Sequence, residues 1–272
     1  MITAGASVVE ADGLAIGYRG RAVVSDLDVV LHAGEALALV GVNGSGKSTL
    51  LKTLAGLIAP VSGRVEVFGR EPGRSPHRVA YLGQFHPAAG LLPLQVRDVV
   101  TMARYRHRGL LGRMTRADHD AVTRSLQRAG IAEHANAPLR SLSGGQQQRA
   151  YLAHALAREA DLILLDEPTA GLDVAANERY AELVREELAR GAAVITATHD
   201  VRDAARCDQV ILLAGRVVAA GRPAEVLSPE RLLDAFGIAL LAVPHEDHTD
   251  LVVPEHPHAH AHTHEPVDRR RA

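Results

Sequence analysis

Short apolar runs broken by glycine make up most of residues 8–85. Runs of this kind, rich in valine and leucine and flanked by turn-forming residues, are typical of β-strands. They predict strands at residues 8–10, 29–31, 36–40, 65–68 and 79–82. One helix is expected to begin near Lys47, directly after the third run. This part of the chain therefore predicts mainly β structure with one helix packed on it.

Residues 86–160 have a different period. Apolar residues recur there three and four positions apart, which is the spacing of one face of an α-helix. The two clearest sets are Val96, Val99, Val100 and Ala103, and then Ala121, Val122, Leu126 and Ala129. We predict a helical subdomain inserted at about residues 86–160.

Residues 161–240 return to an alternation of strands and helices. Apolar runs predict strands at 162–165 and 193–197, with a helix over about 175–190 between them. A hairpin turning at Gly215 is expected from the runs 210–213 and 217–220. Because strands and helices alternate, we expect a mainly parallel sheet with helices on its faces.

The end of the chain, residues 245–272, is compositionally biased. It contains seven histidines, six acids and three arginines, with few large apolar residues after Val253. Such a segment cannot bury enough apolar surface to offset the entropy of ordering. We therefore divide the chain into one folded domain at 1–244 and a disordered, histidine-rich tail at 245–272.

Composition narrows the class of protein. The chain has 272 residues, is 47% hydrophobic and has a formal net charge of -2, which does not suggest a nucleic-acid-binding protein. The single cysteine, Cys207, excludes an internal disulfide framework and favours a reducing compartment. The N-terminus does not have the pattern of a signal peptide. No apolar run approaches the ~20 residues that a membrane-spanning helix needs.

A glycine-rich loop follows the strand at 36–40 and opens the helix near Lys47. It has the pattern G-x-x-x-x-G-K-[ST], and its candidate phosphate-binding residues are Gly41, Asn43, Gly44, Ser45, Gly46, Lys47, Ser48 and Thr49. Glycine lets the backbone approach phosphate oxygens, while successive N–H groups and the helix N-terminus attract negative charge. Lys47 is expected at the β- and γ-phosphates, and the Ser48 hydroxyl on Mg²⁺. Alone, this P-loop predicts only a nucleotide-binding protein.

Two acids follow the apolar run at 162–165. Asp166 and Glu167 would stand at the carboxyl end of the sheet, where α/β folds bind ligands. Successive residues of a strand point to opposite sides, so the two carboxylates can take different roles. We assign Asp166 to Mg²⁺ and Glu167 to the attacking water. Taken alone, the pair could also be a surface turn with two solvated acids.

A third motif identifies the family. Residues 141–149 read Ser-Leu-Ser-Gly-Gly-Gln-Gln-Gln-Arg, about twenty residues before the acid pair. This segment resembles the LSGGQ signature of ABC ATPases. Ser143 is predicted to cap a helix, and Gly144 and Gly145 leave backbone N–H groups open to a second anion. With Gln146, these residues complete the predicted nucleotide-binding set.

The resemblance covers about residues 8–240 and implies an architecture. It implies an α/β fold with a P-loop NTPase core, an N-terminal antiparallel β subdomain and the inserted helical subdomain. In this family the signature of one protomer covers the ATP bound by the P-loop of the other, so we expect a homodimer that sandwiches ATP and Mg²⁺. We expect both sites to be active, because the departures from the family pattern, Ala170 and Val174, remove no catalytic group.

The resemblance also assigns single residues. Tyr18 would stack on adenine, although a lone tyrosine is more often ordinary packing. Gln84 is similar to the Q-loop glutamine that contacts Mg²⁺ or water, and Asp173 to the D-loop aspartate at the dimer interface. His199 is similar to the switch histidine at the γ-phosphate. The catalytic set is therefore Lys47, Gln84, Glu167 and His199.

The family implies partners outside the chain. We expect an integral membrane permease docked on the helical subdomain, a separate substrate-binding protein, no nucleic acid, and a peripheral position on the cytoplasmic face of the membrane. Six arginines against one acid in residues 97–116 could form a basic face towards headgroups or the permease. The alternative is an ordinary solvated helix face.

The transported substrate is suggested by two features. Residues 82–87, 97–100 and 104–106 resemble ATPases of the manganese and zinc uptake group. In the tail, five alternating histidines are candidate ligands for a transition metal: His256, His258, His260, His262 and His264. An inert tail is the alternative. Another cargo, such as haem, a siderophore or an exported molecule, and a soluble ABC ATPase also remain open.

Overall fold

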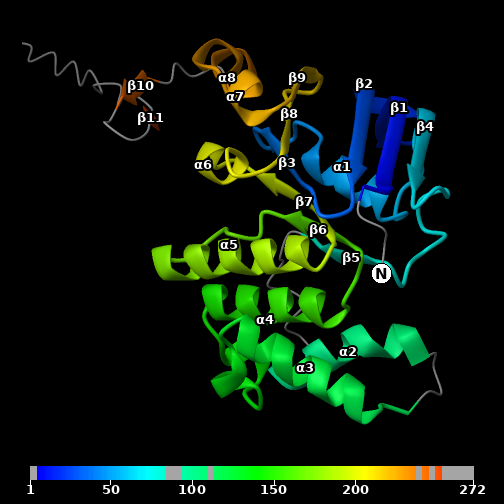
Figure 1. Cartoon of the computed structure of the whole chain (residues 1–272), viewed down its shortest axis with the longest axis vertical. Helices are drawn as coiled ribbons and strands as arrows, with labels where there is room; N and C mark the ends of the chain where they lie inside the picture. Colours follow the sequence, from blue (N-terminus) through cyan, green and yellow to red (C-terminus); the bar gives the residue numbers. More distant parts are fainter. Residues whose placement is uncertain (1–4, 84–93, 109–112, 237–240, 245–248, 253–272) are drawn as a thin grey trace, which may run out of the picture.

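The computed structural model describes residues 5–83, 94–108, 113–236, 241–244 and 249–252. Two sheets and a group of helices form the body of the molecule (Figure 1). The larger sheet has six strands in the order β5-β6-β7-β3-β8-β9. These are β5 (Val79–Leu82), β6 (Leu162–Asp166), β7 (Ala193–Thr198), β3 (Ala36–Gly41), β8 (Gln209–Leu213) and β9 (Val217–Gly221). All neighbours are parallel except β8 and β9, which form the predicted hairpin.

The smaller sheet is antiparallel and has the order β2-β1-β4. Its strands are β1 (Ser7–Tyr18), β2 (Arg21–His32) and β4 (Ser62–Val67). The predicted α/β fold with an antiparallel N-terminal sheet is therefore confirmed. The strands predicted at 8–10 and 29–31 are parts of two longer strands. Phe68, predicted to be in a strand, lies just after β4 with a positive φ of 57°, which ends the extended backbone.

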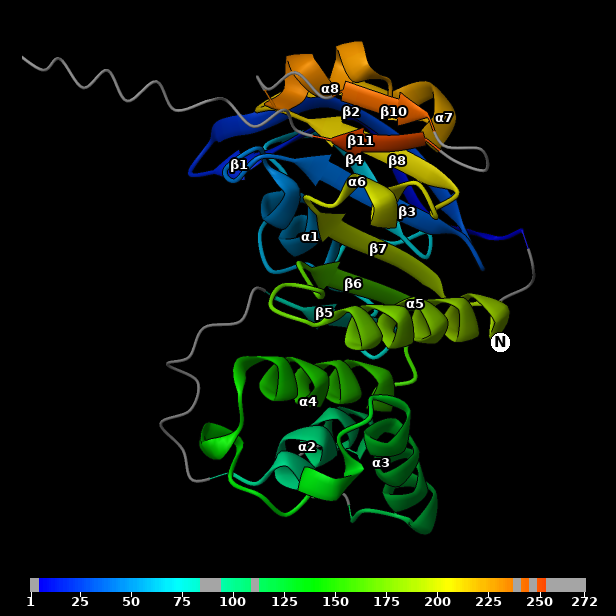
Figure 2. The ribbon, with the colours of Figure 1, turned by 90° about the vertical axis from the view of Figure 1, so that its left-hand side faces the viewer.

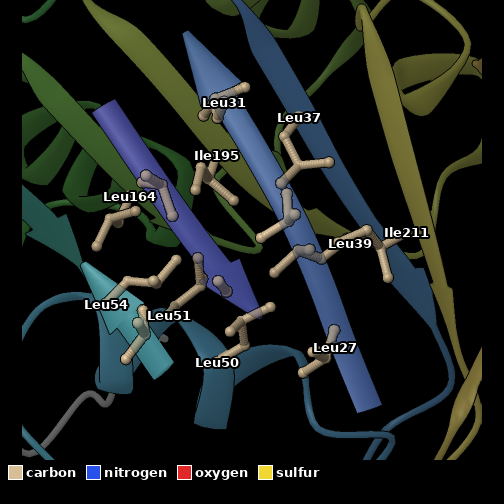
Figure 3. Close-up of a cluster of buried hydrophobic side chains, with 14 of the residues drawn as sticks. Leu27, Leu31, Leu37, Leu39, Leu50, Leu51, Leu54, Leu164, Ile195 and Ile211 are labelled. Atoms are coloured by element: carbon tan, nitrogen blue, oxygen red, sulfur yellow. The ribbon is translucent and has the colours of Figure 1, made fainter. Parts of the chain in front are cut away.

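The main core lies between the two sheets. It contains α1 (Lys47–Leu54), whose Leu50, Leu51 and Leu54 are each 1% exposed or less. Figure 3 shows these leucines in one cluster with Leu27 and Leu31 of β2 and with side chains of the larger sheet, including Leu39, Leu164 and Ile195. Burial of this apolar set fixes α1, and with it the P-loop, against the sheet.

The opposite face of the larger sheet is covered by other helices. Alternate residues of β3 face the two sides, so Leu37 and Leu39 lie in the main core whereas Ala38 and Val40 do not. Helices α4 (Gly144–Ala157) and α5 (Val174–Ala189) cover one half of this face. Over the other half lie α6 (Val201–Ala204), α7 (Pro223–Val226) and α8 (Pro229–Phe236).

The predicted helical segment has its own apolar core. Helices α2 (Val96–Arg108) and α3 (Arg116–Arg128) pack with α4 and with two 3-10 turns, η2 (Ala132–His134) and η3 (Leu139–Ser141). In Figure 2 this group lies below the larger sheet, with α4 next to it. The apolar residues predicted at helical spacing are buried there: Val96, Val99, Val100, Ala103, Ala121, Val122, Leu126 and Ala129.

The position of Arg104 differs from the predicted basic face. Its side chain is buried and donates to the carboxylate of Asp118 at 3.1 Å, to the Ala157 carbonyl at 2.8 Å and to Glu159 at 2.9 Å. Asp118 is fully buried, so the charge of Arg104 is used inside the protein. Arg97, Arg113 and Arg116 are exposed. The face is therefore less basic than the count of arginines suggested.

This buried ion pair joins α2, α3 and the end of α4, so removing one partner should destabilise the helical group. We expect Asp118→Ala to lower the free energy of unfolding by about 3 kcal/mol, because Arg104 would keep a buried, partly unpaired charge. Urea denaturation measures the change. Asp120→Ala, at an exposed position of the same helix, is the control. Equal midpoints for the two variants would contradict the structural role of Asp118.

The histidine-rich tail differs in part from the expectation. Residues Thr249–Val252 form β11, which pairs antiparallel with β10 (Leu241–Pro244). The short apolar and β-branched stretch before Val253 is the reason, since it suits a strand. Regular structure therefore continues past residue 245. The five alternating histidines lie outside the described residues.

Candidate functional site

The P-loop connects the end of β3 to the first turn of α1. Gly46 has φ 111° and precedes the helix, and a Cβ there would lie 2.5 Å from Cγ2 of Val24. At Gly41 a Cβ would lie 2.1 Å from the Leu213 carbonyl oxygen. Close packing against β2 and β8 therefore requires glycine at both positions. The exposed side of the loop is formed by Val42, Asn43 and Gly44.

Lys47 is held inside this loop. Its Nζ donates to the carbonyl oxygens of Gly41 at 2.7 Å and of Val42 at 3.0 Å. Burial lowers the pKa of Lys47, and the nearby carboxylates of Glu167 and Asp166 oppose this effect. The ammonium group is thus placed between the loop and the two acids, although Lys47 and the acids are more than a hundred positions apart in the sequence.

Asp166 is the last residue of β6 and is 2% exposed. Burial raises the pKa of its carboxyl above the usual value. A hydrogen bond from the Ser48 side chain and the positive charges of Lys52 and Lys47 offset only part of this increase. Its Oδ2 atom is buried and has no hydrogen-bond partner among the described residues. This environment differs from a surface turn with two solvated acids. Ser48 and Asp166 form an oxygen-rich corner at the start of α1.

Glu167 lies just beyond the strand, in a backbone conformation that the sequence did not suggest. Its φ is 51°, and its backbone N–H donates to the Ala197 carbonyl at 3.0 Å. A positive φ is uncommon for a residue with a side chain and is found at sites where the surroundings impose it. Glu167 therefore lies outside β6, and the alternation of side chains along a strand does not apply to it.

The signature segment begins α4 as predicted. Ser143 is the N-cap, and its hydroxyl accepts from the Gln146 N–H at 3.3 Å. In return the Gln146 side chain accepts from the Ser143 N–H at 2.9 Å, which completes a capping box. Gly144 has open space where a Cβ would lie, and a Cβ added at Gly145 would lie 3.4 Å from the Gly171 carbonyl oxygen. The helix N-terminus thus has a bare backbone surface.

The signature and the P-loop lie apart within the chain. Figures 1 and 2 show β5 and β6 between α1 and α4. No hydrogen bond between described residues joins the 143–146 segment to the 41–49 loop. The P-loop, Ser48, Asp166 and Glu167 therefore form one cluster, and the signature forms another.

Two further contacts were not predicted from the sequence. The Gln148 side chain, 6% exposed, donates to the Pro168 carbonyl at 3.0 Å and ties α4 to the loop after Glu167. Burial together with the charge of the neighbouring Asp166 raises the pKa of Tyr81. Gln148 stands two residues after Gln146, but nothing in the pattern indicated its partner. Tyr81 could have been suspected only from the pairing of β5 with β6.

The remaining predicted residues lie at element ends. Tyr18 ends β1 and is 46% exposed, and His199 is an exposed residue directly after β7. Asp173 is exposed and caps α5, accepting from the Ala176 N–H at 2.8 Å. Gln84 lies outside the described residues, so its placement stays a prediction.

The chain is similar to proteins of known family. A profile described as "ABC transporter" matches residues 24–170. The zinc transport system ATP-binding protein TroB of Treponema pallidum is 36% identical over 87% of this chain and 89% of its own length. The manganese transport system ATP-binding protein MntB of Bacillus subtilis is 34% identical over 84% of this chain and 92% of its own length.

A solved structure has the same fold. It is a transporter described as metal-chelate type, in an inward-facing conformation, and it superimposes with a TM-score of 0.79 at 26% sequence identity. The match covers 92% of this chain and 98% of the other. In the part of the present chain that the structure describes, no helix has the length and apolar character needed to cross a membrane.

Proposed function

The chain belongs to the ABC transporter family, and from that premise we propose that it is an ATPase subunit that powers import of a divalent metal ion through a partner permease. The family binds ATP and couples its hydrolysis to transport. The observation that carries the proposal is the convergence of Lys47, Ser48, Asp166 and Glu167 at the end of β3 and β6.

The residues present fit MgATP. Backbone N–H groups of the P-loop and the buried Ser45 hydroxyl, which has no hydrogen-bond partner among the described residues, are suited to phosphate oxygens. Ser48 and the unpartnered Oδ2 of Asp166 supply the oxygen ligands that Mg²⁺ prefers. Bound Mg²⁺ would neutralise charge on the phosphates. Gln84 is proposed as a further ligand, and Tyr18 as the surface on which adenine stacks.

We assign hydrolysis to Glu167. Its carboxylate accepts a proton as a water oxygen forms a bond to the γ-phosphorus and the bond to the bridging oxygen of ADP breaks. Lys47 and His199 stabilise the negative charge on the transferred group. Lys47 can exchange its present bonds to the Gly41 and Val42 carbonyls for phosphate oxygens, because both acceptors are backbone atoms within the same loop.

A second copy of the chain would complete each site. The signature N-terminus is an anion site, yet it lies apart from the P-loop of its own chain, which supports a head-to-tail homodimer with the Ser143, Gly144 and Gly145 N–H groups on the partner's ATP. Asp173 stands next to this surface at the start of α5. Outside the dimer we propose a membrane permease on the helical subdomain, a separate substrate-binding protein and a peripheral position on the cytoplasmic face.

The proposed cargo, manganese or zinc, rests on the two metal-transport relatives and on the histidines of the tail. The metal-chelate type of the structural neighbour supports the alternative, a chelated metal such as haem or a siderophore. The two classes of cargo differ in chemistry, since a free divalent ion is taken up without an organic chelator.

Uptake measurements separate these cargoes. We expect cells with the wild-type gene to accumulate radiolabelled manganese or zinc, and cells with Lys47→Ala to lose this uptake because the phosphate contact is gone. Labelled haem and iron siderophore are measured in parallel. Loss of chelate uptake alone would identify the alternative cargo, while unchanged uptake of every compound would reject the transport function.

A further inference from the structure

His134, at the end of η2, contacts the signature of its own chain. Its Nε2 lies 3.0 Å from the Nε2 of Gln146. Gln146 is also the residue whose side-chain oxygen accepts from the Ser143 N–H, 2.9 Å away. A histidine outside the motif therefore contacts the side chain that completes the capping box of α4.

The orientation of the Gln146 amide follows from its two partners. The Ser143 backbone N–H can only donate, so the amide atom facing it is the oxygen. The atom facing His134 is then the NH₂ group, which is a donor. A donor at 3.0 Å requires an acceptor on the ring, so Nε2 of His134 carries no proton and the neutral ring is protonated at Nδ1.

A second partner lies near the same nitrogen. Oε1 of Glu133 is 3.5 Å from Nε2 of His134. A protonated ring is a donor at both nitrogens and cannot accept from Gln146. Nε2–H would then pair with the Glu133 carboxylate, and Gln146 would lose its acceptor. The same ring nitrogen thus has one partner for each protonation state.

Charged residues lie on the elements next to η2, which are α3, the start of α4 and the start of α2. On α2, the Arg97 N–H donates to the Ala135 carbonyl at 2.8 Å, and Arg97 is exposed. On α3, Asp118 is paired with Arg104, Arg124 with Glu159, and Arg128 with Glu186 and Glu187. On α4, the contacting residue, Gln146, is uncharged. Within the described part of the chain, Glu133 is the charged group that forms an ion pair with His134.

We propose that His134 is a positioning residue for the signature and makes the ATPase sensitive to acid. Neutral His134 holds Gln146 in the capping box, which keeps the Ser143 hydroxyl and the glycine N–H groups aimed at the partner's ATP. Protonated His134 pairs with Glu133 and no longer accepts a hydrogen bond from Gln146. The capping box is then held less firmly, and so are the backbone N–H groups of the anion site. The inference rests on the proposed ATPase and dimer, and it adds a regulatory role for one imidazole.

Two substitutions separate positioning from titration. His134→Gln keeps an amide oxygen near the position of Nε2 but does not titrate. His134→Leu has a similar volume and no acceptor. His119→Gln, at an exposed position of α3, makes the same chemical change away from the signature. His199 is present in every variant, so its contribution is common to all the profiles that are compared.

The experiment is a pH profile of ATP hydrolysis from about pH 5.5 to 8.5, the range in which histidine changes charge. We expect kcat to fall at acid pH in the wild type and in His119→Gln by about fivefold more than it falls in His134→Gln. A difference of this size is typical of one hydrogen bond. His134→Leu should be low across the whole range. Identical profiles for the wild type and His134→Gln would overturn the proposal.

A binding measurement gives a second readout. In a Glu167→Gln background, sedimentation measures ATP-driven dimerisation. We expect dimerisation to weaken at acid pH when His134 is present and to stay unchanged when the chain also carries His134→Gln. Dimerisation that is equally pH-dependent in both would contradict the inference. If the wild-type chain neither hydrolyses ATP nor dimerises at any pH, the proposed function fails, whereas an active enzyme with an unchanged profile rejects only the role of His134.

Discussion

Glu167→Gln is expected to bind ATP normally and to hydrolyse it at least ~100-fold more slowly than the wild type. The amide has the shape of the carboxylate but cannot accept a proton from water. Lys47, Ser48 and Asp166 are unchanged, so binding is retained. Because hydrolysis is proposed to release the two protomers, the variant should accumulate as an ATP-bound dimer. Phosphate release and analytical ultracentrifugation measure the two effects.

The control makes the same chemical change elsewhere. Glu71 is a surface residue whose side chain is 78% exposed, so Glu71→Gln should leave kcat unchanged. A Glu167→Gln chain that turns over ATP at the wild-type rate would show that another group accepts the proton. The positive φ of Glu167 would then need a different explanation from catalysis.

Gly145→Asp is expected to abolish hydrolysis while the chain still folds and binds ATP. The new carboxylate would stand at the N-terminus of α4, where the partner's phosphates are proposed to bind, and would repel them. The same charge interacts favourably with the helix dipole, so the helix itself should not be weakened. The nearest atom to the added Cβ is the Gly171 carbonyl oxygen at 3.4 Å, a contact that a small shift accommodates. Loss of at least ~100-fold in kcat is expected.

Mixing two inactive chains provides the decisive comparison. Lys47→Ala damages the P-loop and Gly145→Asp damages the signature, so each homodimer has two defective sites. A mixed dimer has one site built from the intact P-loop of the Gly145→Asp chain and the intact signature of the Lys47→Ala chain. Mixing should therefore restore part of the wild-type rate. Absence of any recovery, with mixed dimers demonstrated by cross-linking, would contradict a site shared between protomers.

Local sequence patterns determined much of the fold. The runs at 36–40, 79–82, 162–165 and 193–197 became the parallel strands, because each is short and almost entirely apolar. The 3- and 4-residue spacing in the middle segment placed its helices for the same reason. The order of strands across the sheet was beyond this reasoning, since pairing of β3 with β7 and β8 depends on packing between distant segments.

The sequence by itself determined the chemical groups of the site: a glycine loop with Lys47 and Ser48, an acid pair after a buried strand, and a capped glycine pair at residues 144–145. It could do so because each motif is local, and its backbone geometry follows from the residues that compose it. Only the tertiary structure decided how these groups act on one another. Folding buries Asp166 and brings it to Ser48, turns Glu167 out of the strand, withdraws Arg104 from the basic face, and places His134 between Gln146 and Glu133. No local sequence pattern indicates such contacts. The energies of these contacts depend on burial and distance, which exist only after the chain has folded.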